Sequence, residues 1–378
     1  MALIRPYPGF GPVCSDEVTT RSSGAVGING LAHGIGADNH ERTMSPISME
    51  ASDLPASYAA GVRLGYRDLP EEVRDWIAGQ LSAPIVEAVD RRGGFSPGAT
   101  ATVHAEDGSG LFIKAVTDAI NVDALQIYRN ERDRSIRLPR RPGILKLSGS
   151  VELTVDDQQW IVIAFPLLDG APPAHPWAKA DAVRCLDLAD RLAIELTPSP
   201  WPEDPEQTQH MINFLSGWQQ VAADESDPWR SDAGKELAAR IDAEQEMLAA
   251  LPGNTLSHFD LRADNIMITG EDQVWFVDWA HARNAARWFD ALLLIADIVS
   301  SGADLADGGE IDVAELLDNH PACARVSRPI KISLLSSLAA TLHAASRKPS
   351  APGLPTIRSW QDLTAESIQR FVRRVERG

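Results

Sequence analysis

One short segment of the sequence carries amide and carboxylate side chains at a spacing suited to holding a divalent cation. Asn265 precedes the apolar run 266–268, and Asp278 ends a second run, 274–277, after an intervening turn. We expect the two runs to form a hairpin in which Asn265 lies opposite Phe276, so that Asp278 sits near the same open end. An amide oxygen and a carboxylate would then converge. These are the hard oxygen ligands that Mg²⁺ takes where phosphoryl groups are transferred.

The loop before this hairpin supplies a candidate catalytic base. Asp260 lies five residues before Asn265, within His258-Phe259-Asp260, where its carboxylate would orient or deprotonate an attacking hydroxyl. We place His258 in the same catalytic group, with bracing of the loop as its more natural task. The alternative is an ordinary turn with capping Asp and Asn residues, and the hairpin that ends in Asp278 argues against it.

The segment SHFDLRADNIMI, followed by VWFVDWAHA, resembles the catalytic core of aminoglycoside phosphotransferases and of related choline, homoserine and fructosamine kinases. The resemblance implies a protein-kinase-like α+β fold with a small β-rich N-terminal lobe and a mainly helical C-terminal lobe. It also implies that Asp260 is the catalytic base and that Asn265 and Asp278 bind Mg²⁺. Asp290 resembles the aspartate that often follows on the next helix, and a helix cap is an equal alternative. Trp279-Ala280 stands where the family often has Gly or Cys.

A cation for the phosphates of a nucleotide is expected in the N-terminal half. The chain has 29 Arg and only 6 Lys, so Lys114 within the apolar run 111–116 calls for a reason, and a compact charge on phosphate is one. Lys146 is a rival in a similar apolar setting. Glu131 follows Lys114 by 17 residues, which is about the family's spacing for the carboxylate that holds the lysine. The alternative for Glu131 is a solvated helix face.

Other residues are assigned to the nucleotide as well. Gly94, Ser96 and Gly98 belong to a glycine-containing loop whose backbone could approach phosphate closely. Phe165 and Leu167 lie in the segment that we expect to meet the nucleotide base. We expect the nucleotide to be ATP or GTP, and Mg²⁺ to accompany it.

The same glycine loop fits the G-x-S-x-G pattern of serine hydrolases, which is a rival reading. That motif leads into a helix, whereas residues 99–103 favour a strand. The residue after the nucleophile must also donate its backbone N–H to the oxyanion, and Pro97 has none. We therefore set the hydrolase reading aside.

Composition along the chain predicts four parts. Residues 1–48 lack helical or strand periodicity and are expected to form a disordered tail. Residues 49–165 are expected to form the nucleotide-binding lobe, and 166–176, with Asp-Gly and Pro-Pro, a hinge or linker. Residues 177–378 then form the helical lobe with the catalytic loop and the acceptor site.

Residue patterns also predict individual elements. One or two helices are expected over 69–89, a strand hairpin over 100–103 and 111–116, a helix over 121–137, strands over 144–153 and 160–165, and a later hairpin over 265–279.

The net charge of −18 is concentrated in one segment. Residues 201–320 hold 24 acidic and 6 basic side chains, while the rest of the chain is balanced. Such a field repels nucleic acid and attracts cations, which favours an aminoglycoside or another amine-bearing acceptor. Asp224, Glu225 and Asp227 are candidate contacts. Solubility alone is an equal explanation of the charge, and a neutral sugar, homoserine or a macrolide is an alternative acceptor.

Cysteine usage and hydropathy bear on location. The three cysteines are far apart, and the N-terminal region lacks the apolar run of a signal peptide. We expect a cytoplasmic protein without membrane or nucleic-acid partners; its oligomeric state is not encoded in these patterns.

Together these observations predict a small-molecule kinase that moves the γ-phosphoryl group of ATP or GTP to a hydroxyl. A protein kinase would need a long segment after its metal-binding aspartate, yet Asp290 follows Asp278 by only 12 residues. The alternative is a degenerate kinase fold with a nucleotide-binding or regulatory role.

Overall fold

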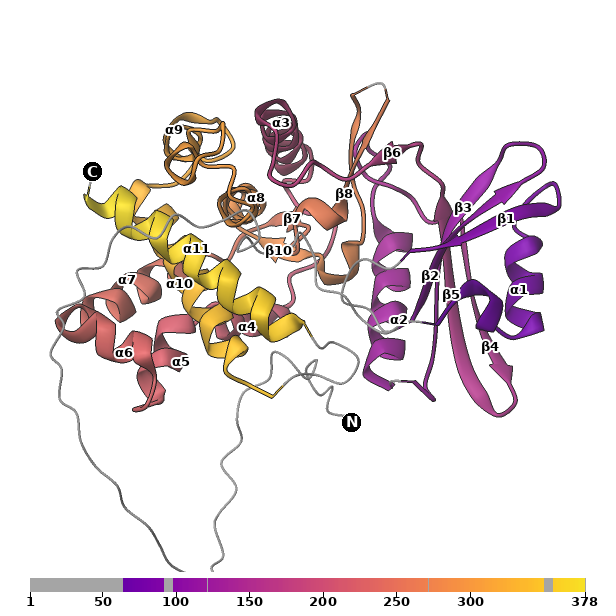
Figure 1. The fold of residues 1–378 in the computed structure, drawn as a ribbon, viewed down its shortest axis with the longest axis horizontal. Coiled ribbons are helices and arrows are strands. Elements are labelled where there is room, and N and C mark those ends of the chain that lie inside the picture. Colours follow the sequence, from indigo (N-terminus) through magenta and orange to yellow (C-terminus); the bar gives the residue numbers. More distant parts are fainter. Residues whose placement is uncertain (1–63, 92–97, 121, 271, 350–355, 378) are drawn as a thin grey trace, which may run out of the picture.

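The chain folds into two lobes. The computed structural model describes residues 64–91, 98–120, 122–270, 272–349 and 356–377. A five-stranded sheet with two helices forms one lobe, and the other is mostly helical (Figure 1). The two-lobed α+β fold that the sequence predicts is confirmed. The expected tail, 1–48, lies outside the described residues, and the expected hinge at 166–176 stays a prediction.

The strands are β1 (Ile85–Asp90), β2 (Ala99–Ala105), β3 (Gly110–Thr117), β4 (Gly149–Val155), β5 (Gln158–Pro166), β6 (Gly170–Ala171), β7 (Thr255–Ser257), β8 (Ile266–Thr269), β9 (Val274–Phe276) and β10 (Arg283–Ala285). The helices are α1 (Glu71–Ala78), α2 (Val122–Arg137), α3 (Lys179–Glu195), α4 (Pro205–Phe214), α5 (Gly217–Ala223), α6 (Pro228–Ala233), α7 (Leu237–Ala250), α8 (Phe289–Ser300), α9 (Val313–Asn319), α10 (Arg328–Ser346) and α11 (Ile357–Arg377).

Side chains of the five-stranded sheet alternate between a face covered by α1 and a face covered by α2. Its order is β1-β2-β3-β5-β4, and all neighbours are antiparallel. On β3, Ile113 and Ala115 join the core that α1 covers, whereas Val116 joins the cluster that α2 covers. Successive side chains of a strand point to opposite faces. Lys114 therefore lies on the α2 side, which also faces the second lobe.

Two expected elements were wrong in part. The helix expected over 69–89 ends at Ala78, and Ile85–Asp90 is instead a strand at the sheet edge. Pro84 prevents the helix from continuing, and the β-branched pair Ile85-Val86 favours a strand, in which Val86 is 65% exposed. The strand expected over 144–153 begins only at Gly149, since Ile144 forms a single bridge to Phe276. The expected strand hairpin, the helix over 121–137 and the later hairpin are confirmed.

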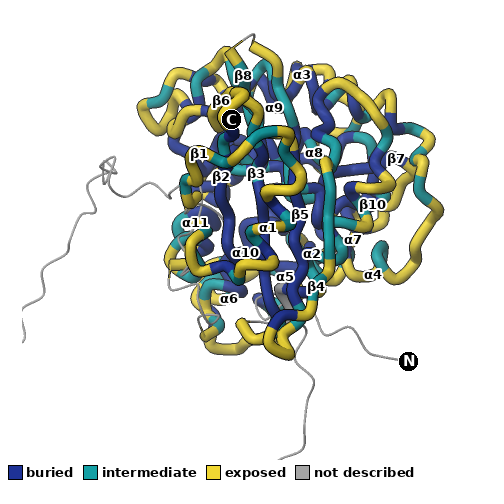
Figure 2. Tube along the Cα trace, turned by 90° about the vertical axis from the view of Figure 1, so that its right-hand side faces the viewer, coloured by how far each residue is buried: buried dark blue, intermediate teal, exposed yellow. Residues whose placement is uncertain are grey.

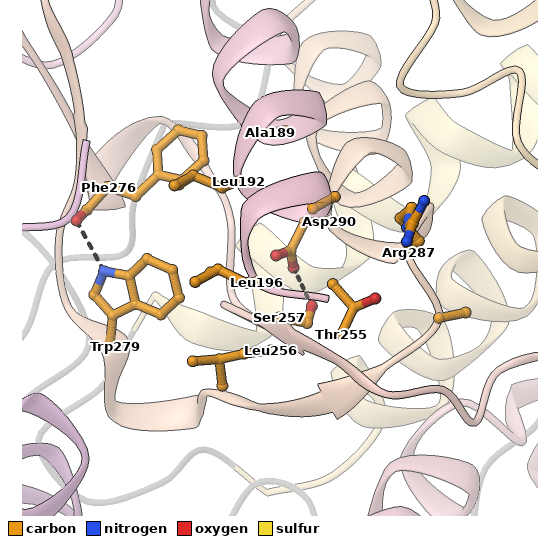
Figure 3. Close-up of a pocket in the computed structure, with 12 residues that line it drawn as sticks. Ala189, Leu192, Leu196, Thr255, Leu256, Ser257, Phe276, Trp279, Arg287 and Asp290 are labelled. Carbon is orange, nitrogen blue, oxygen red and sulfur yellow. Dashed lines mark hydrogen bonds between the residues drawn. The ribbon is translucent and has the colours of Figure 1, made fainter. Parts of the chain in front are cut away.

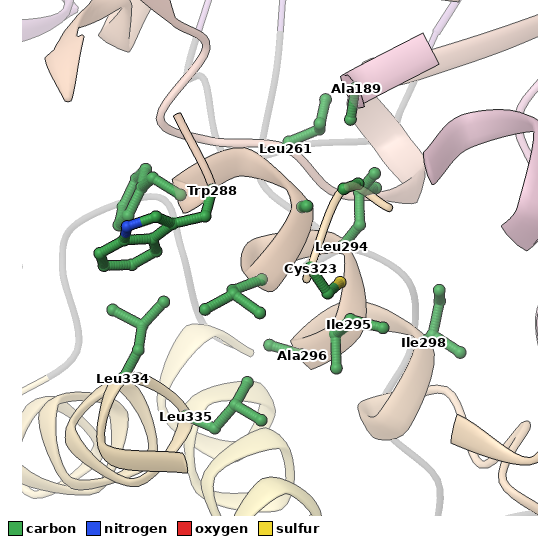
Figure 4. Packing of buried hydrophobic residues seen from close by; sticks show 14 of the residues in the cluster. Ala189, Leu261, Trp288, Leu294, Ile295, Ala296, Ile298, Cys323, Leu334 and Leu335 are labelled. Atoms are coloured by element: carbon green, nitrogen blue, oxygen red, sulfur yellow. The ribbon is translucent and has the colours of Figure 1, made fainter. Parts of the chain in front are cut away.

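The helical lobe is built around α8. Leu294 and Ile295 are fully buried, and Leu334 and Leu335 of α10 pack in the same cluster (Figure 4). In Figure 2 the buried residues lie along the inner strands and α8, and the exposed ones lie on the outer turns. None of the described helices is long and apolar enough to cross a membrane. The rigid core thus lies directly behind the segment that carries the candidate site.

Helix α5 crosses α10 at a glycine, which gives a test of this packing. A Cβ at Gly217 would collide with the backbone nitrogen of Thr341 and the backbone oxygen of Ser337. We expect Gly217→Ala to lower the free energy of unfolding by about 1–3 kcal/mol, because backbone cannot move aside as a side chain can. Gly270→Ala is the matched control, since its Cβ would meet no heavy atom within 4 Å. Equal midpoints for the two variants in urea unfolding would contradict this packing.

Candidate active site

One buried ammonium joins three elements of the structure. Lys114 Nζ on β3 lies 2.7 Å from Glu131 Oε1 on α2 and 2.9 Å from Asp278 Oδ2 after β9. Lys114 and Glu131 are 8% and 1% exposed, so the solvated helix face is excluded for Glu131. The pairing expected from the spacing of these residues is present in the structure.

The pKa values of this group follow from burial and from the sharing of one cation by two carboxylates. Burial raises the pKa of Glu131 to about 7, and the charge of Asp278 adds to the shift against the opposing effect of Lys114. Burial would raise the pKa of Asp278 too, but the Lys114 ammonium outweighs it and lowers that pKa to about 2. Although burial disfavours its charge, the two carboxylates raise the pKa of Lys114. Asp278 is thus ionised and Lys114 charged at neutral pH.

Asp290 holds the candidate catalytic loop in place. Its carboxylate accepts hydrogen bonds from the Ser257 hydroxyl at 2.6 Å and from the backbone N–H groups of His258 at 2.7 Å and Phe259 at 3.0 Å. Figure 3 shows Asp290 directed at Ser257 beside a gap of about 10 Å³, room for no more than one water molecule. Asp290 does more than cap a helix: it fixes the loop backbone where Phe259 takes a φ of 69°.

His258 is fully buried and links two parts of the site. Its Nε2 lies 2.7 Å from the backbone oxygen of Val277, and its Nδ1 accepts from the backbone N–H of Asp260 at 3.3 Å. The ring therefore ties the Asp260 loop to the residue before Asp278. This position suits the bracing task expected for His258.

Asp260 and Asn265 are in direct contact. The Asn265 amide nitrogen donates to the Asp260 backbone oxygen at 2.7 Å and to its carboxylate at 3.0 Å. This use of the nitrogen leaves the Asn265 side-chain oxygen for another ligand. The Asp260 carboxylate is 37% exposed and lines the cleft between the lobes.

The hairpin register differs by one residue from the expected one. Ile266 pairs with Phe276, and the Val277 N–H donates to the Asn265 backbone oxygen at 2.9 Å, so Asn265 lies opposite Val277. The turn closes with a bond from Thr269 N–H to the Gln273 oxygen, which shifts its centre. Asn265 and Asp278 still share the open end, and Asp278 takes the left-handed conformation with φ 60°.

Three partly buried charged residues behind the loop were missed by sequence reasoning. Arg262 lies 2.9 Å from Asp264 and 3.4 Å from Asp260, and Asp297 of α8 accepts from Trp177 Nε1 and from the backbone N–H of Ala263, both at 2.9 Å. Burial raises the pKa of Asp264 to about 7 although Arg262 opposes the shift. The lone Asp297 in the apolar run 291–299 was the only signal available in the sequence.

A cleft of about 800 Å³ opens between the lobes at this group. On the sheet side its wall is largely apolar and includes Phe112, Leu145, Phe165, Leu167, Met267 and Val277. Lys114 and Glu131 line the same cleft, and the expected role of Phe165 and Leu167 at a nucleotide stays a prediction.

The glycine loop is only partly described. Gly94 and Ser96 lie outside the described residues, while Gly98 packs so closely that a Cβ would stand 2.5 Å from the Ala115 backbone oxygen. Close packing within the sheet therefore explains by itself why residue 98 is a glycine.

The remaining candidates lie elsewhere. Lys146 Nζ donates to the backbone oxygens of Ser135 at 3.0 Å and Ile136 at 3.3 Å, so it caps the end of α2 and is not in the cleft wall. Asp227 is buried against His343, and Asp224 and Glu225 pair with arginines at 3.6 and 4.0 Å. None of these three carboxylates lines the cleft, because their helices pack on the far side of α10.

The titration of Glu131 gives a test of the buried group. Its folded pKa of about 7 exceeds the ordinary 4.5, so the folded state binds the extra proton and stability falls as pH rises from about 4.5 to 7. We expect Glu131→Gln to abolish this fall. Between pH 4.5 and 7 the free energy of unfolding of the variant should therefore rise relative to that of the wild type, by up to about 3 kcal/mol, as measured from unfolding midpoints.

The matched control is Asp133→Asn, an exposed carboxylate on the same helix. Its midpoint should follow the wild type at every pH. A Glu131→Gln difference that does not change with pH would refute the raised pKa.

Comparisons with known proteins agree with this geometry. Residues 142–326 match the sequence model of the phosphotransferase enzyme family. The structure is similar to choline kinase LicA from Streptococcus pneumoniae, with a TM-score of 0.50 and 9% identity over 79% of this chain and 98% of that one. A thermostable mutant of aminoglycoside phosphotransferase APH(4)-Ia, in complex with ADP and hygromycin B, gives a TM-score of 0.50 and 11% identity over 80% and 97% of the two chains.

A further similar structure is a fructosamine-3-kinase homologue from Thermobifida fusca, with a TM-score of 0.46 and 18% identity over 80% of this chain and all of that one. A comparison with curated proteins found no match. At such identities the two structures with a TM-score of 0.50 show a shared fold, and the sequence model covers the 257–278 segment with its loop and hairpin. Residues 142–326, just under half of the chain, thus match the phosphotransferase enzyme family, as the SHFDLRADN motif within them suggested.

Proposed function

We propose that the chain transfers the γ-phosphoryl group of ATP or GTP to a hydroxyl of a small molecule. The observation that carries this proposal is the convergence of four side chains on one cleft: the Lys114 ammonium, the Asp260 carboxylate, the Asn265 amide and the Asp278 carboxylate. A cation for phosphate, a base and two oxygen ligands are the components that phosphoryl transfer needs.

The apolar wall of the sheet side suits a nucleotide base. Phe112 and Leu145 from the sheet lobe and Met267 from β8 line it, with Lys114 at its inner end. The similar APH(4)-Ia structure holds ADP, and this supports the same nucleotide class here. Recognition of the base through backbone groups would leave ATP and GTP both acceptable.

The donor set fits Mg²⁺. Asp278 is ionised and 35% exposed, and its Oδ2 contacts Lys114, which leaves Oδ1 for a metal. Asn265 presents its side-chain oxygen because its nitrogen is held by Asp260. Asn265 and Asp278 would hold a divalent cation here, and it would neutralise negative charge that develops during phosphoryl transfer.

The residues of the chain then have separate tasks. Lys114 binds phosphate oxygens, and Glu131 keeps its ammonium at that position. Asp260 orients the acceptor hydroxyl and takes its proton as the acceptor oxygen bonds to the γ-phosphorus. The bond from that phosphorus to the β,γ-bridging oxygen breaks, which yields a phosphate ester and a nucleoside diphosphate. Catalysis here rests on positioning and electrostatics.

A degenerate kinase fold that only binds nucleotide is the alternative. It shares the Lys114–Glu131 pair with an active enzyme and differs in whether Asp260 does chemistry. Turnover therefore separates the two.

Asp260→Asn tests the role of the base. The asparagine keeps the hydrogen bond with Asn265 but cannot accept the proton, so we expect phosphoryl transfer to fall by about 10²–10⁴-fold. Nucleotide affinity by calorimetry should change less than about twofold. The matched control is Asp272→Asn on the exposed turn of the hairpin, which should retain full rate. Full activity of Asp260→Asn in a coupled assay would remove Asp260 from the mechanism.

Lys114 and its rival Lys146 give a second test. Lys114→Met should lower kcat/KM for the nucleotide by about 10²-fold or more, because the phosphates lose their cation. Lys146→Met removes only the cap on α2, so its unfolding temperature should drop while kcat/KM is kept. The reverse pattern would assign the phosphate-binding role to Lys146.

A further inference from the structure

The half of the cleft beyond Asp260 is built from helices and is mainly apolar. It is walled by α4, α8, α10 and α11, which lie on the other side of the catalytic loop from the sheet (Figure 1). The side chains that carry this character are Phe214, Leu293, Leu338, Leu342, Ile357 and Trp360. If the sheet side takes the nucleotide, this half is the place for the acceptor.

Helix α11 turns one continuous face to the cleft. Its lining residues are Ile357, Trp360, Gln361, Thr364 and Ile368, a spacing of three, four, seven and eleven residues from the first. Residues at these intervals share one side of a helix. The residues of α11 that line the cleft therefore form one continuous face of the helix.

This wall lies against the catalytic carboxylate. The Arg262 guanidinium is 3.4 Å from Asp260 and sits 5.1 Å from the centre of the Trp360 ring. On the other side Phe259, next to Asp260 in the chain, stacks on Phe289 at 4.8 Å. A hydroxyl that reaches Asp260 therefore belongs to a molecule whose body meets aromatic and aliphatic surface.

Two buried polar atoms in this wall have no partner among the described residues. They are Nε2 of Gln361, a residue that is fully buried, and Oγ1 of Thr364, which is 5% exposed. The Gln361 side-chain oxygen accepts a hydrogen bond from Arg358 at 2.9 Å. This contact fixes the orientation of the amide and leaves its nitrogen without an acceptor. Buried donors without partners are costly, and a ligand oxygen would satisfy both atoms.

The charges here do not suit a polycation. The described carboxylates of the helical lobe that line the cleft, besides Asp260, are Asp264, Asp278 and Asp297, and each contacts a donor of the protein. A buried positive charge also lines the cleft: Arg283 is 6% exposed, and its guanidinium lies 4.0 Å from the centre of the Phe259 ring. Burial lowers the pKa of Arg283 to about 9, and Arg134 adds to the shift.

We propose that the phosphoryl acceptor is an uncharged, largely apolar alcohol that carries a carbonyl or ether oxygen for Gln361 and Thr364. This inference rests on the proposed kinase function and names the substrate class of the same site. It replaces the cationic acceptor that the acidic segment favoured, because only four of the described acidic side chains of that segment line the cleft, namely Asp260, Asp264, Asp278 and Asp297.

The first experiment measures binding without turnover. Nile red, a neutral apolar dye with a ring carbonyl, should bind the wild-type protein with enhanced, blue-shifted emission in the presence of the ATP analogue AMP-PNP, and kanamycin A should not displace it. Thr364→Lys places an ammonium in the wall and should weaken dye binding about tenfold or more. Glu366→Lys, on the exposed face of α11, is the matched control and should not. Absent dye binding, or displacement by kanamycin A, would overturn the proposal.

The second experiment tests the polar contacts with a conservative pair. Gln361→Leu removes the free donor and keeps the wall apolar, so dye affinity should drop about five- to tenfold. Gln369→Leu alters another buried glutamine of α11 whose side-chain oxygen lacks a partner but which does not line the cleft, and it should have no effect. Equal effects of the two would reject the contact.

Turnover separates this inference from the kinase function. Transfer from radiolabelled ATP should have a higher kcat/KM for the neutral steroid alcohol hydrocortisone than for kanamycin A. A preference for kanamycin A would overturn the apolar acceptor and leave the kinase standing. Dye binding without AMP-PNP binding in calorimetry would instead reject the kinase function.

Discussion

The arrangement of the site depends on one ammonium that two carboxylates share. Lys114 is fixed by the alternation of β3, Glu131 by its place on α2, and Asp278 by the end of β9, so the contact joins elements from both lobes. One cation does not balance two carboxylates, so the pKa of Glu131, which is buried, is raised while that of Asp278 is lowered by Lys114. With Asp260 nearby, the group holds more negative than positive charge. It is therefore electrostatically prepared for a metal ion together with a nucleotide, and less so for either alone.

A second constraint ties this group to the core. Asp290 lies in the first turn of α8, a helix whose other face packs among leucines and isoleucines. Its carboxylate accepts three hydrogen bonds from the segment that leads to Asp260. His258 continues the connection to Val277 and hence to Asp278. The positive φ of Phe259 persists because these bonds and its aromatic neighbours hold it there. The loop thus has the rigidity of the core, and the geometry of the catalytic group does not depend on an occupied cleft.

Local patterns were enough to predict the hairpin, and the spacing in the family that the chain resembles predicted the Lys114–Glu131 pair; the structure shows both. The direct contact of Asn265 with Asp260 was not predicted. The register was wrong by one residue because turn geometry, and not the apolar runs, sets it. The edge strand β1 was taken for helix because short apolar runs fit both periods. Asp297 and Arg262 could not be placed, since their partners come from distant segments.

Charge summed along the sequence is a poor guide to a binding cleft for the same reason. Within the acidic segment 201–320, Asp227 makes a buried contact with His343 and Glu225 lies on the surface, and only Asp260, Asp264, Asp278 and Asp297 of its described acidic residues line the cleft. Much of the wall beside Asp260 comes from α8, α10 and α11. The packing of those helices, and not the summed charge of the sequence, determines which of their side chains line the cleft. Because β3, α2, the 257–278 segment and the carboxylates of α8 hold the proposed catalytic group, the walls from α10 and α11 can vary without disturbing it. A shared core with a separately built acceptor wall, as proposed, would explain how one fold accommodates acceptors of different chemistry.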